Sequence, residues 1–355
     1  MKQSEKTRNL LIKHYQKYPR LQTQDILKFL YQSAFGCEHL VSSLEMAING
    51  IRKEYCNLTH DVAECIDELD GEYSRVHLSC LNGGLDAETL GKLFTASAKV
   101  EPEGKKDLEN KLAVVGELLS EGKLPIALDE FEKTVLEWKE LGYPSIHHSE
   151  VFRECYHPSY RVVSDRYVPF LPLFSEIDKR LKTGNLVIAI EGGSASGKST
   201  LGDLLASVYD CTVFHMDDFF LRPEQRTKER YAEVGGNVDR ERFLEEVLIP
   251  LKNKQTISYR RFDCSTMAIA TAMEIVPKRL TVIEGAYSMH SELAEHYDFS
   301  VFLDIAPDIQ KARIAKRNSP QMAQRFFNEW IPLEEVYFSQ MKVKERCDLC
   351  ISVCK

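Results

Sequence analysis

The chain has 355 residues, more than a single hydrophobic core usually accommodates, so we expect two domains. Its formal net charge is −8 and it carries no basic run or stripe, which argues against a nucleic-acid-binding protein, although a few local cations suffice to hold a phosphorylated ligand. No apolar run approaches membrane-spanning length, the first residues lack the apolar core of a signal peptide, and the ten cysteines lack framework spacing, so we expect a cytoplasmic protein with reduced thiols and no membrane partner.

The first half of the chain, to about residue 170, carries apolar residues at helical spacing in three long segments. The first is interrupted at Gly36, the second ends near Gly122, and the third ends at Gly142 and Pro144. We therefore predict a mostly α-helical N-terminal domain. It holds no motif that indicates a chemistry, and three roles stay open for it: completing an acceptor pocket, forming a homo-oligomer, or an unrelated activity. The three segments are 24–51, 107–124 and 127–144.

A proline-marked stretch at 167–172 and a short helical segment at 175–182 separate this half from the rest. We place the domain boundary there, which gives domains of residues 1–178 and 179–355. Beyond it, short β-rich runs alternate with helical ones, and this alternation is typical of an α/β domain with a parallel sheet flanked by helices. The five predicted strands are 186–190, 212–215, 280–284, 299–303 and 348–353.

Residues 192–200 read GGSASGKST and contain the full pattern of a phosphate-binding loop between a strand and a helix. Glycines permit a loop whose N–H groups point inward, and the following helix offers its positive end to an anion. Lys198 supplies a charge for the β- and γ-phosphates, and Ser199 supplies a hydroxyl to Mg²⁺. The motif predicts binding of ATP with Mg²⁺ without naming the phosphate acceptor. The predicted ATP-binding residues are Gly192, Gly193, Ser194, Ala195, Ser196, Gly197, Lys198, Ser199 and Thr200.

Carboxylates follow two of the predicted strands. Asp217 and Asp218 come after the second strand, and Glu284 ends the third strand before Gly285. Because ligands of open α/β sheets bind beyond the carboxyl ends of the strands, we expect these side chains near the phosphate loop. They could take the proton of an attacking hydroxyl or hold magnesium. The alternative for each of them is a capping or turn role, which aspartate and glutamate often have.

The motifs GGSASGKST, MDDFF, GGNVDRERF and VIEGAY, followed by an arginine-rich segment, resemble the uridine kinase/phosphoribulokinase group of P-loop kinases, to which nicotinamide riboside and pantothenate kinases are related. The resemblance covers about 185–355. It implies that Asp217 is the catalytic aspartate facing the acceptor hydroxyl, with Asp218 beside it, and that Glu284 helps to hold magnesium. It further implies that Asp239 binds sugar hydroxyls, although Asp239 is equally placed to cap the helix that follows.

Tyr259 and Phe262 lie where uridine kinases carry a tyrosine-containing hairpin that meets the base. The chain departs from the family there, because Cys264 and the residues after it replace the usual histidine and arginine. This departure leaves the nucleobase preference open. Asp217, Asp218, Asp239, Tyr259 and Phe262 are our predicted acceptor-binding residues.

Residues 309–325 are rich in arginine, and in the family a helix and lid at this place bring arginines over the transferring phosphates. Helical order favours Arg317 as the catalytic lid residue, with Arg313 second and Arg325 after a Ser-Pro break. A solvated basic face is the alternative. Cys347 and Cys350 form a C-x-x-C pattern, but we interpret it as part of the last strand. We also interpret His147, His148, His157 and the weaker Glu38–His39 pair as packed or surface residues and not as a metal site.

We conclude that the C-terminal half is an ATP-dependent small-molecule kinase with Asp217, Lys198 and Arg317 as catalytic residues. Uridine or cytidine is the first predicted acceptor, and another riboside or small alcohol metabolite is the alternative. A hypothesis from a different class is a nucleotide-gated regulatory or binding protein, because a phosphate loop alone requires binding and not transfer.

Overall fold

The computed structural model describes residues 3–37, 43–58, 64–98 and 103–353. The chain divides into two compact units, Met1–Asp178 and Lys179–Lys355, and the division falls inside helix α8 (Leu171–Leu181). Within the described residues, none of the helices has both the length and the apolar character needed to cross a bilayer.

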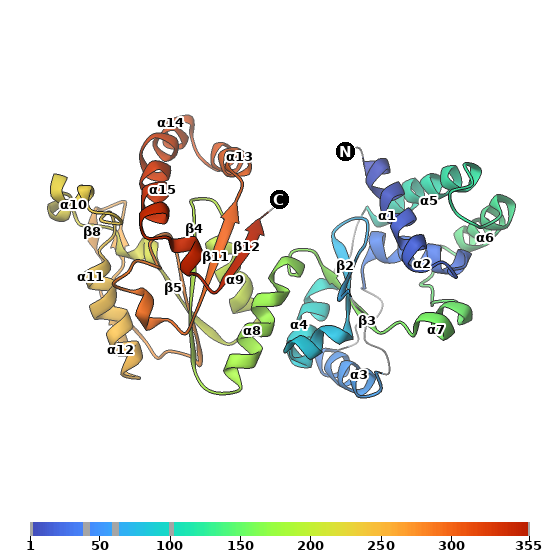
Figure 1. Cartoon of the computed structure of the whole chain (residues 1–355), viewed down its shortest axis with the longest axis horizontal. Helices are drawn as coiled ribbons and strands as arrows, with labels where there is room; N and C mark the ends of the chain where they lie inside the picture. Colours follow the sequence, from blue (N-terminus) through green and yellow to red (C-terminus); the bar gives the residue numbers. More distant parts are fainter. Residues whose placement is uncertain (1–2, 38–42, 59–63, 99–102, 354–355) are drawn as a thin grey trace. The chain divides into compact units, whose positions relative to one another are not determined.

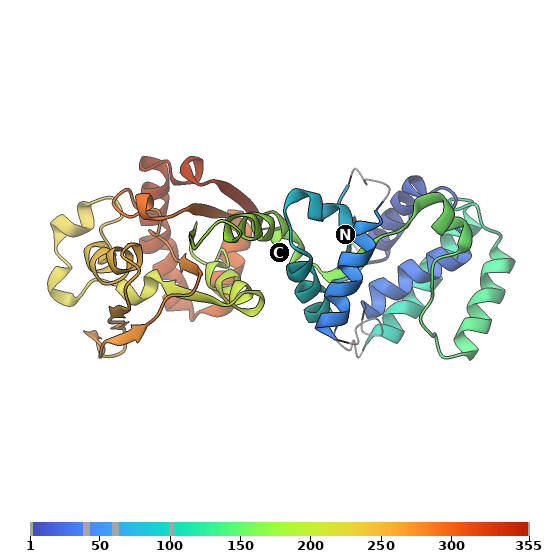
Figure 2. The ribbon, with the colours of Figure 1, turned by 90° about the horizontal axis from the view of Figure 1, so that it is seen from below.

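Helices make up most of the first unit, as predicted. Besides α8 they are α1 (Gln3–Lys17), α2 (Thr23–Phe35), α3 (Leu44–Cys56), α4 (Ala87–Ser97), α5 (Gly104–Ser120), α6 (Leu128–Glu140) and α7 (Glu150–Tyr156). Gly36 stops α2 with a φ of 61°, and its N–H donates to the carbonyl oxygen of Gln32 at 2.9 Å. Ser43 caps α3 by accepting the N–H of Met46 at 3.2 Å. Two views agree that α5 and α6 lie together at one end of this unit (Figures 1 and 2).

The first unit also contains a small sheet that the sequence analysis did not predict. Its strands are β1 (Ile66–Glu68), β2 (Tyr73–His77) and β3 (Tyr160–Ser164), and they pair antiparallel in the order β1-β2-β3. The central strand β2 is buried along its whole length although it contains Arg75 and His77. Such a short strand with buried polar residues lacks the alternating pattern that identifies a strand from sequence.

The second unit is built on a five-stranded parallel sheet, which confirms the predicted fold. Its strands are β4 (Leu186–Gly192), β5 (Cys211–His215), β10 (Leu280–Glu284), β11 (Phe299–Ile305) and β12 (Leu349–Val353). The spatial order is β12-β11-β4-β10-β5, so β4 lies in the centre. Side chains such as Ile188, Ile190 and Val282 are fully buried, because helices cover both faces of the sheet. Figure 1 shows α9 (Lys198–Val208) on one face and α11 (Arg240–Phe243) with α12 (Ile249–Lys252) on the other.

The remaining elements of this unit lie between and after the sheet strands. A π-helical turn at Leu244–Leu248 joins α11 to α12, and a second one at Phe326–Trp330 precedes α15 (Ile331–Gln340). Two small hairpins pair β6 (Ile257–Tyr259) with β9 (Met273–Ile275) and β7 (Phe262–Asp263) with β8 (Ala268–Ile269). The other helices are α10 (Lys228–Ala232), α13 (Pro307–Arg317), α14 (Pro320–Arg325) and α16 (Val343–Arg346).

Candidate functional site: a phosphate loop at the carboxyl edge of the sheet

The predicted phosphate loop joins the end of β4 to the start of α9. Gly192 has a φ of 148°, and a Cβ atom there would lie 2.6 Å from the carbonyl oxygen of Leu303 and 2.9 Å from Ser196 Oγ. Gly197 has a φ of 99° and directly precedes the first turn of α9. Both positions therefore require glycine, one because of its conformation and close contacts and the other because of its conformation. The loop turns its backbone toward the N-terminus of α9, as an anion site needs.

Lys198 folds back over this loop. Its Nζ donates to the carbonyl oxygens of Gly192 at 2.8 Å and Gly193 at 3.0 Å, which keeps the ammonium group beside the loop backbone. Ser199 and Thr200 follow in the first turn of α9, and both are exposed. The exposed Ser199 hydroxyl is a suitable oxygen donor for Mg²⁺, which prefers oxygen ligands and keeps part of its water shell.

Side chains from α13 and α15 hold the outside of the loop. Gln310 donates to the carbonyl oxygen of Ser194 at 2.9 Å, and Arg313 donates to that of Ala195 at 2.9 Å. Glu334, which is buried, accepts the Ser194 N–H at 2.8 Å and its hydroxyl at 2.6 Å. Burial raises the pKa of Glu334, and Lys198 and the Ser194 bonds oppose that rise. Gln310 and Glu334 were not among the predicted site residues, and no motif marks either of them.

A second missed carboxylate lies behind the loop. Glu191 is fully buried and accepts the N–H groups of Gly192 at 2.9 Å and Met289 at 3.0 Å and the hydroxyl of Tyr337 at 2.9 Å. Burial raises its pKa to about 7, although these hydrogen bonds favour the charged form. An acidic residue at the end of a wholly apolar strand was the available signal for this residue.

The predicted carboxylates Asp217 and Glu284 lie at the same edge of the sheet as the loop. Glu284 ends β10, and its register partners are Ile190 on β4 and His215 on β5. Glu284 Oε1 lies 2.5 Å from His215 Nδ1, and this bond raises the pKa of His215 above its usual value. His215 was not among the predicted site residues.

Asp217 lies two residues beyond the end of β5. Crowding by protein atoms and the nearby Glu284 carboxylate raise its pKa, while the Lys198 charge lowers it. Its carboxylate in turn raises the pKa of Glu334. These effects place Lys198, Glu284 and Glu334 within electrostatic reach of Asp217.

Asp218 forms an ion pair with an arginine that the sequence analysis did not select. Arg261 Nε lies 3.1 Å from Asp218 Oδ2, and the same guanidinium donates to the Tyr259 hydroxyl at 3.2 Å and 3.3 Å. The Tyr259 ring is fully buried and lies between Phe214 and Phe219 in the core. Only the hydroxyl end of Tyr259 therefore meets this polar cluster.

Two further predicted acceptor residues have structural contacts. Asp239 is buried, caps α11 by accepting the N–H of Arg242 at 3.4 Å and pairs with its guanidinium at 3.2 Å. The structure thus shows the capping role that the sequence left as the alternative. Phe262 is 5% exposed on β7, so little of its ring reaches a ligand in this arrangement.

The three predicted lid arginines have different surroundings. Arg313 contacts the phosphate loop, whereas Arg317 is exposed and lies 6.0 Å from the ring of Phe326. Arg325 pairs with Glu329 one helical turn away, and both side chains are more than half exposed. Helical position ranked Arg317 above Arg313 as the catalytic lid residue. Among the described contacts, however, it is Arg313 that reaches the phosphate loop.

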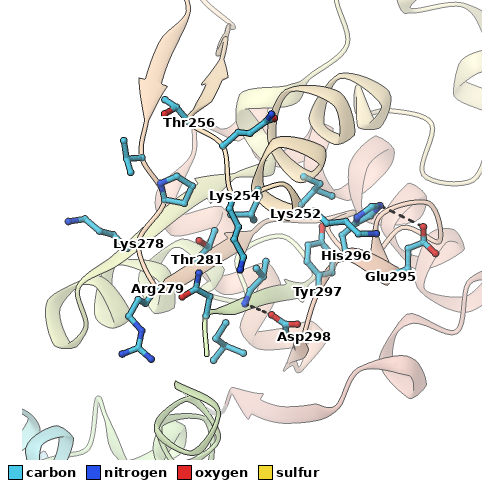
Figure 3. A pocket seen from close by; sticks show the side chains of 18 residues that line it. Lys252, Lys254, Thr256, Lys278, Arg279, Thr281, Glu295, His296, Tyr297 and Asp298 are labelled. Carbon is cyan, nitrogen blue, oxygen red and sulfur yellow. Dashed lines mark hydrogen bonds and ion pairs between the residues drawn. The ribbon is translucent and has the colours of Figure 1, made fainter. Parts of the chain in front are cut away.

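A pocket of about 450 Å³ in this unit lies away from the phosphate loop (Figure 3). It is lined by residues at the starts of β4 and β10 and by Glu295–Asp298 before β11, so it lies at the opposite edge of the parallel sheet. Figure 3 shows Lys254 extending across its centre. The pocket is therefore separate from the loop and its carboxylates.

The cysteines and histidines that the sequence analysis set aside show no metal arrangement within the described residues. Cys350 lies exposed on β12, and Cys347 precedes that strand. His148 is buried and bonded to Asp25 and Tyr160. The weaker pair at residues 38 and 39 lies outside the described residues.

Comparison with known proteins agrees with the motifs. Residues 187–328, less than half of the chain, match the model of the Phosphoribulokinase / Uridine kinase family. Among solved structures, the chain is similar to a possible uridine kinase from Bacillus stearothermophilus, at 24% identity and a TM-score of 0.39 over 50% of this chain and 98% of that one. It is also similar to shikimate kinase from Aquifex aeolicus, at 17% identity and a TM-score of 0.25 over 47% and 85% of the two chains. No curated protein sequence matches the chain. The resemblance predicted from the motifs is confirmed by the match of residues 187–328 to this family model.

Proposed function

We propose that the C-terminal unit is an ATP-dependent kinase that phosphorylates a hydroxyl group of a small molecule, with a nucleoside such as uridine or cytidine as the first acceptor. One observation carries the proposal: Asp217 lies within electrostatic reach of Lys198, so a carboxylate and the phosphate-loop lysine share one site. A carboxylate at this place can take the proton of an acceptor hydroxyl, which transfer to a small molecule requires and nucleotide binding alone does not.

The reaction follows from these positions. Asp217 accepts the proton of the acceptor hydroxyl as the hydroxyl oxygen forms a bond to the γ-phosphorus of ATP. The bond from the γ-phosphorus to the β–γ bridging oxygen breaks, and ADP leaves with that oxygen. The raised pKa of Asp217 suits a group that must gain a proton in the reaction. Lys198 exchanges its bonds to the Gly192 and Gly193 carbonyls for the phosphate oxygens.

The Ser199 hydroxyl and the Glu284 carboxylate are the residues that would hold Mg²⁺. Bound magnesium neutralises charge on the β- and γ-phosphates. Glu284 is only 4% exposed, and its contact with His215 fixes the orientation of its carboxylate.

The acceptor site is proposed around Asp217 and the Asp218–Arg261–Tyr259 cluster. Its polar atoms are suited to the hydroxyl groups of a sugar. The hairpin of β7 and β8 carries Asp263 and Cys264 where the family has its base-contacting residues, so another riboside or a small alcohol metabolite is the alternative acceptor.

The test is ADP release by the full chain with Mg-ATP and a panel of nucleosides and polyols. We expect at least one nucleoside to stimulate release strongly, and Asp217→Asn to reduce that turnover by about 10²- to 10⁴-fold while leaving ATP affinity within about threefold. Asp210→Asn is the matched control, because Asp210 is an exposed aspartate that pairs only with the surface residue Lys278 among the described contacts. Unchanged turnover in Asp217→Asn would remove that residue from its assigned role.

A second candidate, a nucleotide-gated regulatory protein, is favoured by the Glu334 carboxylate, which already occupies the N–H of Ser194 in the loop. Such a contact can switch when a nucleotide arrives. Tight ATP binding with no stimulation by any acceptor would support this candidate over the kinase.

A further inference from the structure

The first unit contains a pocket of about 300 Å³ that no motif marks. It lies among the end of α1, strand β2, the end of α7 and the start of β3, and this volume is at the lower end of those that take small metabolites. Asp67, Arg75, His77 and Ser79 are its buried polar residues, while Lys17, Cys155 and His157 are among its more exposed ones. The pocket is a candidate binding site because some of the buried polar atoms in its lining residues have no hydrogen-bond partner.

Arg75 is 1% exposed and forms no ion pair with any residue in the described part of the chain. Its Nε donates to Gln32 at 2.8 Å, and its guanidinium lies 4.8 Å from the centre of the Tyr160 ring, but Nη2 has no hydrogen-bond partner. Burying a guanidinium is costly unless an anion or a full set of acceptors compensates its charge. The arginine therefore points to a missing acceptor.

The carboxylate opposite Arg75 is already used by other groups. Asp67 lies directly opposite Arg75 across strands β1 and β2. Its carboxylate, however, pairs with the ammonium group of Lys17, accepts a hydrogen bond from the Tyr18 hydroxyl at 2.7 Å and lies 3.0 Å from His77 Nε2. These bonds hold the pKa of Asp67 well below its usual range, so it stays charged. Lys17, Tyr18 and His77 thus supply the hydrogen bonds of Asp67, and none of the described contacts joins its carboxylate to Arg75.

A second buried atom on the same strand is also without a partner. His77 lies two residues after Arg75 on β2, so both side chains project from the same face of the sheet. While Nε2 of His77 bonds to Asp67, its Nδ1 has no partner, and neither does the buried Oγ of Ser159 nearby in the pocket lining. Three residues that line the pocket thus have an unpartnered buried atom, namely Arg75 Nη2, His77 Nδ1 and Ser159 Oγ.

Aromatic rings supply the remaining walls. Tyr18, Phe152 and Tyr156 pack against one another with ring centres 4.8–5.1 Å apart, and Tyr160 completes the set. Flat apolar groups bind well to such rings, and arginine is the side chain best shaped to hold a carboxylate or a phosphate with two parallel hydrogen bonds.

We propose that this pocket is a binding site for a small organic oxyanion, with a carboxylate or phosphate group held by Arg75 and a flat apolar part lying against the tyrosine rings. All residues that line the site belong to the first unit, so this proposal does not depend on the proposed kinase activity.

The pocket contains its own reporter, because Cys155 is an exposed thiol in its lining. The experiment measures alkylation of Cys155 by iodoacetamide in the full chain, peptide by peptide, with Cys264, an exposed thiol of the other unit, as the internal control. The probes are benzoate and phenyl phosphate, and neutral benzamide is the matched control for charge. We expect either anion at saturation to slow alkylation of Cys155 by about fivefold or more while the rate at Cys264 stays unchanged.

The two anions distinguish a carboxylate ligand from a phosphate ligand, and calorimetric titration gives the affinity of each. We expect Arg75→Gln to weaken the preferred anion by at least about tenfold, in line with loss of a charged hydrogen bond, and Arg161→Gln to change it by less than about twofold. Arg161 is the matched arginine, on β3 of the same sheet but paired with Glu54. If Arg75→Gln does not fold, the preference of the wild type for benzoate over benzamide tests the same charge without a substitution. Protection by neither anion, or equal binding of benzoate and benzamide, would overturn the proposal.

Discussion

The two sites of this chain are built in opposite ways. The phosphate loop lies in one continuous stretch, 192–200, and its geometry comes from glycine conformations and backbone groups. The pocket of the first unit gathers Lys17, Asp67, Arg75 and Phe152 from four separate elements, and its chemistry comes from side chains alone. A site made by local backbone leaves a motif in the sequence, whereas a site assembled by tertiary contacts leaves none.

The largest expected effect separates the two sites. Lys198→Ala removes the charge beside the loop, so we expect ATP-dependent phosphorylation to fall by about 10³-fold or more, because phosphoryl transfer depends on electrostatic stabilisation. Coupled measurement of ADP release checks this. Lys254→Ala, which changes an exposed lysine of the pocket at the opposite edge of the sheet, is the control and should leave turnover within about twofold.

The same variant tests whether the first unit's pocket is independent. Protection of Cys155 by benzoate or phenyl phosphate should be the same in Lys198→Ala as in the wild type. Loss of protection together with loss of turnover would mean that the two sites are coupled.

The contrast between local patterns and tertiary contacts also explains which strands could be predicted from the sequence. Runs rich in apolar residues, such as 186–190 and 280–284, identified the parallel strands, because a strand buried on both faces is mostly apolar. The small sheet escaped prediction because β2 buries the polar residues Arg75 and His77, so it lacks the apolar pattern of a buried strand.

The candidate site was predictable where residues follow strands directly. Asp217 and Glu284 meet the loop because the carboxyl ends of parallel strands share one edge. Gln310 and Glu334 reach the loop from helices more than a hundred residues later, and nothing in the sequence specifies which helical face turns toward it. Asp239 shows the converse, because a residue suited to two roles is here used as a cap.

The lid arginines combine both features, because they serve a site that a motif marks but reach it through tertiary contacts. We expect Arg313→Ala to lower kcat/KM by about 10- to 100-fold, since its guanidinium holds the backbone of the proposed phosphate-binding loop at Ala195. Arg325→Ala should stay within about twofold, because that side chain is exposed and paired with Glu329. Steady-state kinetics of both variants and of Arg317→Ala show whether Arg313 or Arg317 contributes more to catalysis. A larger loss in Arg317→Ala than in Arg313→Ala would restore the order that helical position suggested and would indicate that the lid moves on binding.

A smaller effect is expected at Glu334. Because its carboxylate accepts the Ser194 N–H, we expect it to compete with a bound phosphate, and Glu334→Gln should tighten ATP binding by about three- to tenfold, as expected for removing one nearby negative charge. Glu335→Gln is a closely matched control, because Glu335 is the next residue on α15 and is exposed. Calorimetric titration with ATP measures both. Weaker binding in Glu334→Gln would mean that the glutamate supports the loop and does not compete with its ligand.

The smallest effect concerns the His215–Glu284 pair, which joins the ends of two neighbouring strands. The pKa of His215 is raised in the folded chain above its usual value of 6.5, so the folded state binds this proton more tightly than the unfolded state does. The stabilisation is therefore complete below pH 6.5 and is lost as the pH rises through the raised value. We expect the excess stability of the wild type over His215→Asn to be largest near pH 6 and smallest near pH 9, with a change below about 1 kcal/mol because the ring is about one-third exposed.

Denaturant unfolding at the two pH values measures this difference. His290→Asn should show the opposite trend below pH 6.5, because burial lowers the pKa of His290 and its protonation opposes folding. A difference for His215→Asn that stayed constant or grew with pH would mean that the contact with Glu284 is held without a charged imidazole. In that case Glu284 would be oriented by a neutral hydrogen bond, and its readiness to hold magnesium would not vary with the protonation of its neighbour across this range.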